Sequence, residues 1–87
     1  MEIEFDPAKD EANKAKHGVS LSAGVFVLES QIGEEVDDRQ DYGEERINAF
    51  GLVEGRLFVC TYTRRSGVFR VISVRLASRQ ERRRWLT

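Results

Sequence analysis

Three alternating segments separated by short turns constrain the fold of this chain most strongly. Apolar and polar residues alternate over residues 45–53, 56–63 and 68–75, and β-branched residues occur in all three. A period of two is typical of half-buried strands. Glu54-Gly55 has the composition of a two-residue hairpin turn, and Arg64-Arg65-Ser66-Gly67 that of a longer turn. The sequence therefore predicts a three-stranded antiparallel meander.

Helix signals lie on both sides of this meander. Asp6-Pro7 begins a helix, because Asp accepts hydrogen bonds from the first free N–H groups and Pro fits the first helical position. His17-Gly18 ends that helix, since Gly readily adopts the left-handed conformation that follows a helix. Residues 19–29 repeat the helical pattern. Ser78 and Glu81 have the spacing of a capping box, which predicts a last helix.

Shorter segments complete the expected architecture. Residues 2–5 alternate and predict an edge strand, residues 31–36 are compatible with a short strand, and residues 37–43 indicate a loop. A narrow face of small residues is expected to pack the first helix against the sheet: Ala8, Ala12 and Ala15. The predicted fold is α+β, with two N-terminal helices and one C-terminal helix packed on a three- to four-stranded antiparallel sheet. Residues 1–87 are expected to form a single domain.

The net charge of −1 conceals an uneven distribution along the chain. Residues 1–45 carry four basic and thirteen acidic side chains, whereas residues 46–87 carry ten basic and two acidic ones. All ten cations of the second half are Arg, whose planar fork of donors suits phosphate oxygens. The asymmetry predicts one side that faces a polyanion and an opposite acidic side. A solvated basic surface is the simpler interpretation of the same pattern.

Several classes of protein are disfavoured. No apolar run approaches the ~20 residues of a membrane span, and the N-terminus lacks a signal-peptide pattern. The single Cys60 is expected to be a small buried residue of a cytoplasmic protein, because one cysteine cannot form a disulfide within the chain. We expect no metal and no cofactor, since His17 is the only histidine and the acidic 37–41 segment lacks the Gly and Glu positions of a calcium loop.

The cationic residues are the main candidates for chemistry. In the last strand, alternation would place Arg70 on one face and Arg75 on the opposite face. A partly buried Arg70 could equally form a structural ion pair with a helix carboxylate such as Glu29. Three arginines of the last helix share one surface by their i, i+3, i+4 spacing: Arg79, Arg82 and Arg83. Trp85 in the same helix either packs the helix on the sheet or stacks on a base.

Proton transfer has two candidate groups. His17 is either a helix C-terminal residue that suits the negative end of the helix dipole, or a general acid or base. Glu45-Arg46 is either a simple ion pair, or a unit in which Glu45 takes a proton while Arg46 orients phosphate. The sequence leaves both pairs of alternatives open.

Short motifs in a fixed order resemble the BrnT family of type II toxins. The opening of the chain matches through Phe5-Asp6-Pro7-Ala8-Lys9, Asn13 and Lys16-His17-Gly18-Val19. The centre matches through Glu44-Glu45-Arg46 and Ala49-Phe50-Gly51. The end matches through the strand at 70–75 and the segment 77–83.

The resemblance implies a fold like that of RelE-type ribonuclease toxins, RNA cleavage that inhibits translation and growth, and neutralisation by a BrnA-like ribbon-helix-helix antitoxin. It also implies two toxin copies in the complex and contact with DNA only through the antitoxin. The positions that match family site residues are His17, Glu45, Arg46, Arg70, Arg75 and Arg82. The usual acidic residue is missing from the turn at 63–67, so Arg64 and Arg65 cannot be distinguished there, and Leu76 replaces the usual Lys.

The preferred hypothesis is an endoribonuclease that acts without a metal. Arg75 and Arg82, with Arg64 or Arg65 assisting, would bind the phosphate, and Glu45 or His17 would transfer a proton. Further phosphate contacts are expected from the remaining basic candidates: Arg46, Arg65, Arg70, Arg79 and Arg83. The alternative is a non-catalytic nucleic-acid- or partner-binding module that uses its basic C-terminal half.

Overall fold

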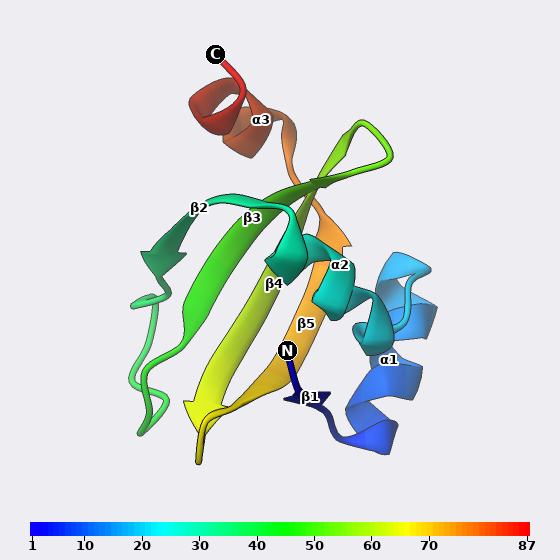
Figure 1. Ribbon diagram of the computed structural model, residues 1–87, viewed down its shortest axis with the longest axis vertical. Helices are drawn as coiled ribbons and strands as arrows, with labels where there is room; N and C mark the ends of the chain where they lie inside the picture. Colours follow the sequence, from blue (N-terminus) through cyan, green and yellow to red (C-terminus); the bar gives the residue numbers. More distant parts are fainter.

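The computed structural model describes residues 1–87 and contains helices and strands in an α+β arrangement (Figure 1). The elements are, in order, β1 (Ile3–Glu4), α1 (Pro7–His17), the 3-10 helix η1 (Leu21–Ala23), α2 (Gly24–Glu29), β2 (Gln31–Val36), β3 (Ile47–Val53), β4 (Arg56–Arg65), β5 (Val68–Leu76) and α3 (Arg79–Trp85). No helix has the length and apolar character that a membrane crossing requires.

The sheet has five strands in the order β1-β5-β4-β3-β2 and is mixed. β2 to β5 pair antiparallel, which confirms the predicted meander, while β1 pairs parallel to β5. The expectation of three or four antiparallel strands was therefore wrong in two respects. Both short segments form strands, which gives five. β1 is parallel to β5, because α1 and α2 first carry the chain to β2 at the opposite edge and the meander then returns to β5 in the direction of β1 (Figure 1).

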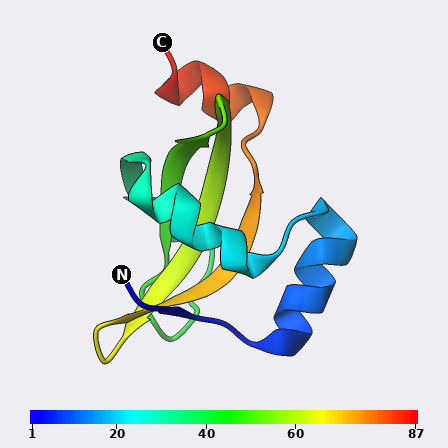
Figure 2. The same ribbon diagram turned by 45° about the vertical axis from the view of Figure 1, so that its right-hand side comes forward.

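Helices cover the two faces of the sheet unequally (Figure 2). η1 and α2 contribute Leu21, Val27 and Leu28 to the main apolar cluster, which also contains Cys60 and Val71 from the sheet. Cys60 is fully buried in this cluster, as the sequence predicted, and burial raises the pKa of its thiol to about 12. The other face carries a second cluster, formed by Phe50, Leu57, Val59 and Ala77. α3 covers this cluster with the side chain of Trp85. No helix covers the rest of this second face, which carries Asn48, Thr61 and Thr63, and we call it the open face.

Trp85 anchors α3 to the sheet. Its ring stacks on Phe50 with 4.7 Å between centroids. A Cβ atom at Gly33 would lie 2.2 Å from the Trp85 ring, so only glycine leaves room for the indole at this position. The packing interpretation of Trp85 is therefore confirmed.

A β-bulge changes which side chains of β5 lie on the same face of the sheet. The register shifts between Thr61 and Tyr62, so that Thr61 pairs with Ser73 and Tyr62 with Val71, and Ile72 is the extra residue. Residues before and after a bulge no longer alternate as in a regular strand. Arg70 and Arg75 therefore lie on the same, open face, and not on opposite faces as strict alternation predicted.

α1 docks on the sheet through polar side chains. Its buried residues are Asp10 and Asn13, so the expected packing face of alanines was wrong. The Asn13 amide donates to the Val74 and Val19 carbonyls, both at 2.8 Å, and accepts from the Val74 N–H at 3.3 Å. The Asp10 carboxylate accepts from the Leu21 N–H at 2.8 Å. Backbone groups at the β5 edge and at the start of η1 need partners, and these two side chains supply them.

Two local expectations also change. The second helix starts later than residue 19, because the Ser20 hydroxyl accepts from the Ser22 N–H and begins η1, and α2 follows from Gly24. The second hairpin has a two-residue turn, Ser66-Gly67, both with positive φ. β4 therefore extends through Arg64 and Arg65, which point to opposite faces of the sheet.

Replacing Asn13 with alanine should destabilise the fold by ~2–4 kcal/mol, because the buried Val74 N–H and C=O would lose their partner. Chemical unfolding followed by the fluorescence of the single tryptophan measures this. Glu11→Ala, on the exposed side of α1, is the control and should cost less than ~0.5 kcal/mol. Equal effects of the two substitutions would contradict the docking role of Asn13.

Candidate functional site

A basic pocket lies between α1 and β5. Its volume is about 260 Å³, and no carboxylate lines it. Lys9, Lys16 and His17 project from α1, and Ser73 comes from the β5 strand just beyond the bulge. The docking of Asn13 on Val74 brings these two elements together. Cations gathered without a carboxylate partner attract an anion such as phosphate.

His17 is the last residue of α1, and Gly18 follows it with φ 74°. The pKa of its imidazole lies below the ordinary 6.5, because the ring is partly removed from water and because the positive charges of Lys16 and Arg75 disfavour a further cation. The ring is thus mainly neutral at physiological pH and can accept a proton. The influence of Arg75 on this pKa shows that the two predicted residues lie within electrostatic reach of each other.

Arg75 is held by Glu81 at the start of α3. Its Nη1 and Nη2 atoms donate to the two carboxylate oxygens at 2.7 and 3.0 Å. Glu81 also accepts from the Ser78 N–H at 2.8 Å and so completes the capping box that the sequence predicted. These contacts lower the pKa of Glu81 to about 2, and the hydrogen bond from Arg75 is the largest cause. The guanidinium group is therefore fixed in orientation before any ligand binds.

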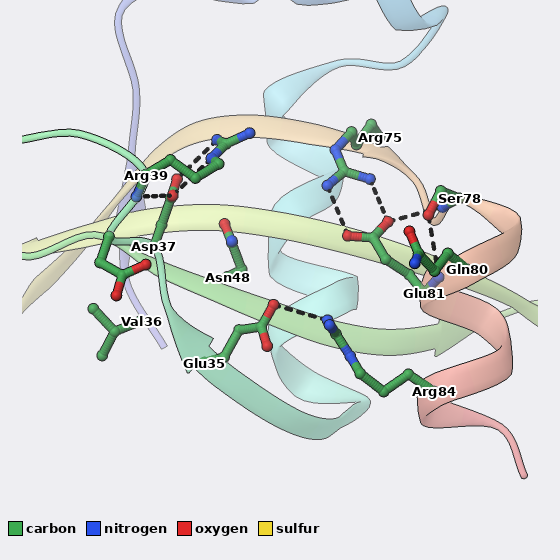
Figure 3. A pocket seen from close by; sticks show the side chains of 11 residues that line it. Glu35, Val36, Asp37, Arg39, Asn48, Arg75, Ser78, Gln80, Glu81 and Arg84 are labelled. Carbon is green, nitrogen blue, oxygen red and sulfur yellow. Dashed lines mark hydrogen bonds and ion pairs between the residues drawn. The ribbon is translucent and has the colours of Figure 1, made fainter.

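A broad polar hollow of about 560 Å³ crosses the open face between the loop after β2 and α3 (Figure 3). Asn48 lies at its centre, and paired charges form its walls: Asp37 with Arg39, Glu35 with Arg84, and Glu81 with Arg75 (Figure 3). Each arginine here already has a carboxylate partner. The hollow therefore offers fewer free cations for phosphate than the basic pocket does.

Arg82, Arg64 and Glu45 lie away from the basic pocket. The Arg82 guanidinium donates to the Ala77 carbonyl at 3.0 Å and lines another hollow with Arg56. Arg64 and Glu45 line a third hollow, where Arg64 stacks on the Phe69 ring. Arg64 and Val59, the partner of Arg75, are five residues apart on β4, or roughly 17 Å at ~3.4 Å per residue. The structure therefore does not bring the five predicted catalytic residues to one place.

The other basic candidates are similarly dispersed. Arg46 stacks on the Tyr42 ring, Arg65 pairs with Glu44 at 3.1 Å, and Arg70 pairs with Glu4 at 3.4 Å. Arg70 is thus in a structural ion pair, although its partner is on β1 and not on the second helix. Arg79 and Arg83, like Arg82, are exposed on α3 and have no carboxylate partner.

Sequence reasoning missed Lys9, Lys16 and Ser73 as site residues. Both lysines belong to the acidic half of the chain, where they look like ordinary surface charges. Their i, i+7 spacing on one helix places them on one side of α1, two turns apart. That spacing, together with His17 directly after Lys16, was the available signal.

Comparison with known families identifies the class of this protein. The chain matches, over residues 5–81, the family described as "Ribonuclease toxin, BrnT, of type II toxin-antitoxin system". It belongs to this family of toxins, as the ordered motifs suggested, and the family implies an RNA target and an antitoxin partner. No curated protein matched the chain.

The single histidine makes the electrostatics of the site directly measurable. We expect the His17 ring signals in NMR to titrate with a midpoint below 6.5, and Arg75→Met to raise that midpoint because a neighbouring positive charge is removed. Arg56→Met, which removes an equal charge at a different hollow, should leave the midpoint unchanged. A wild-type midpoint above 6.5 would contradict this description.

Glu81 should make stability depend on pH. Its pKa is about 2 in the folded state and 4.5 ordinarily. The ionised Glu81 therefore stabilises the fold fully above pH 4.5, and this stabilisation is lost as the pH falls from 4.5 toward about 2. Glu81→Gln, which can still cap α3, should therefore lower stability at neutral pH and flatten its decline in acid. Thermal unfolding at a series of pH values tests this, with the exposed Glu54→Gln as control. Parallel curves for all three proteins would refute it.

Proposed function

We propose that this chain is a metal-independent endoribonuclease whose active site is the basic pocket together with Arg75. The observation that carries this proposal is a neutral His17 among cations on a carboxylate-free surface beside a fixed guanidinium group. These groups suit RNA, which supplies both the phosphate charge and an internal nucleophile. Membership of a family of ribonuclease toxins supports the same reaction.

The proposed reaction is an internal transfer within RNA. His17 removes the proton from a ribose 2′-OH, and the 2′ oxygen attacks the adjacent phosphorus. The bond from phosphorus to the 5′ oxygen breaks, and the ammonium group of Lys9 or Lys16 gives that oxygen a proton. The products are a 2′,3′-cyclic phosphate and a free 5′-OH. Arg75 donates to the phosphate oxygens, on which negative charge increases in the transition state.

His17 is a better candidate than Glu45 for the base. Glu45 lines a hollow with Arg64 and Glu44, at the end of the sheet where β4 turns into β5. A proton acceptor must lie within hydrogen-bond reach of the group that it deprotonates. His17 instead lies in a pocket that no carboxylate lines, within electrostatic reach of the fixed Arg75.

The physiological role that we propose is growth arrest by RNA cleavage that inhibits translation, in the cytoplasm. Neutralisation is by a BrnA-like ribbon-helix-helix antitoxin, through which alone the toxin is brought to DNA. A RelE-like fold and an assembly with two toxin copies belong to the same proposal. The α+β architecture and the family membership support these points.

RNA cleavage should persist in EDTA and should require His17 and Arg75. We expect His17→Ala and Arg75→Ala each to lower kcat/KM by ~10²–10³, because each removes a positioned group that acts in the transition state. Cleavage of a labelled single-stranded RNA, with detection of the cyclic phosphate end, measures this.

Arg56→Ala is the matched control, because it removes an arginine from a hollow that shares no residue with the basic pocket. Its kcat/KM should stay within about twofold of wild type. Larger losses in Arg82→Ala or Arg64→Ala than in Arg75→Ala would show that the active site lies elsewhere. Salt-sensitive RNA binding with no cleavage products would favour the non-catalytic binding module.

A further inference from the structure

The two edges of the sheet differ in whether other parts of the chain cover their backbone groups. At the β5 edge, β1 pairs with Phe69 and Arg70, and the Asn13 amide covers Val74. At the other edge, β2 is the outermost strand, and no element lies beyond it (Figures 1 and 2). An uncovered strand presents unpaired N–H and C=O groups that can pair with another chain.

The hydrogen-bond pattern shows which backbone groups of β2 face outward. The Asp37 N–H donates to the Arg46 carbonyl at 2.8 Å, and Glu35 pairs with Asn48 in the same register. Hydrogen-bonded and non-hydrogen-bonded pairs alternate along an antiparallel ladder. The N–H and C=O groups of Glu34 and Val36 therefore point away from β3. The side chains of Ile32 and Val36 are 45% and 54% exposed.

The charges along β2 define what can pair with it. Carboxylates without a cationic partner lie before, within and after the strand: Glu29, Glu34 and Asp38. Glu35 and Asp37 add two more, although each is paired with an arginine. RNA would be repelled by this edge. A second copy would also be disfavoured, because antiparallel pairing of two β2 strands places carboxylates opposite carboxylates.

We propose that the β2 edge binds an extended, Lys- or Arg-rich segment of the antitoxin polypeptide by strand addition. This inference rests on the proposed function, since it assigns a surface to the partner of the toxin. The six residues of β2 accommodate a segment of similar length. Its backbone pairs with Glu34 and Val36, and its cations meet the carboxylates that have no cationic partner in the fold. The antitoxin is thereby held on the acidic side of the molecule, from which it can extend over the neighbouring open face.

Two substitutions test the two parts of this interaction. Val36→Pro removes one outward N–H, and edge strands tolerate proline at such positions. Asp38→Lys reverses an exposed charge that has no partner in the fold. Together they should raise the dissociation rate of the toxin's complex with its antitoxin by ~10- to 100-fold. Val36→Thr with Glu54→Lys is the matched control, because it keeps the N–H and changes an equal charge at the β3–β4 turn; its rate should stay within about threefold of wild type.

Hydrogen exchange in the wild-type complex gives a second readout. The amides of Glu34 and Val36 should exchange more slowly in the complex than in the free toxin. Slow exchange there, together with fast dissociation of the doubly substituted toxin, supports the proposal. Unchanged exchange at both amides, or equal dissociation of the doubly substituted toxin and its control, overturns it.

A growth assay separates this proposal from the proposed function. The doubly substituted toxin should still arrest growth when expressed alone, but co-expressed antitoxin should no longer relieve the arrest. Full relief of the doubly substituted toxin would overturn strand addition and leave the ribonuclease proposal intact. Absence of arrest by the wild-type toxin would count against the ribonuclease proposal, while exchange and dissociation would still decide the role of β2.

Discussion

The hydrogen bonds between Asn13 and Val74 hold the molecule together at the place where the candidate site forms. A strand edge left without partners would carry unsatisfied backbone groups, and the side-chain amide of Asn13 supplies a donor and an acceptor in the geometry of a neighbouring strand. The same contact sets the position of α1 along β5. It therefore decides that His17, four residues later on the helix, lies near Arg75, one residue after Val74.

The β-bulge at Ile72 is the second constraint on the site. In a regular strand, Val71 and Val74 would point to opposite faces, but both are buried in the main apolar cluster. The extra residue makes this possible and moves Arg75 to the open face together with Arg70. Core packing on one face thus determines which arginines the other face presents. A bulge next to a functional surface is a common way to reorient a side chain.

Local signals in the sequence predicted most helices and strands. The features that the sequence did not predict depend on contacts between residues that are distant along the chain. Asp6-Pro7, Gly18 and the Ser78–Glu81 capping box each act within a few residues, so α1 and α3 were correctly located. The bulge and the parallel pairing of β1 depend on partners far along the chain. The same limit applies to the candidate site: residue type suggested His17 and Arg75, but only the three-dimensional arrangement shows that Arg82 and Arg64 line other hollows.

The pairing of Arg75 with Glu81 separates two contributions that a cationic site can make. Because Glu81 already balances the charge of Arg75, the positive potential of the proposed site comes mainly from Lys9 and Lys16, which have no carboxylate in their pocket. In the proposed reaction Arg75 would instead contribute geometry, since Glu81 already orients its guanidinium group and little reorganisation would be needed in the transition state. In the proposed reaction, lysines that attract RNA and a fixed arginine that holds the reacting phosphate would thus have separate roles, the first on α1 and the second on β5.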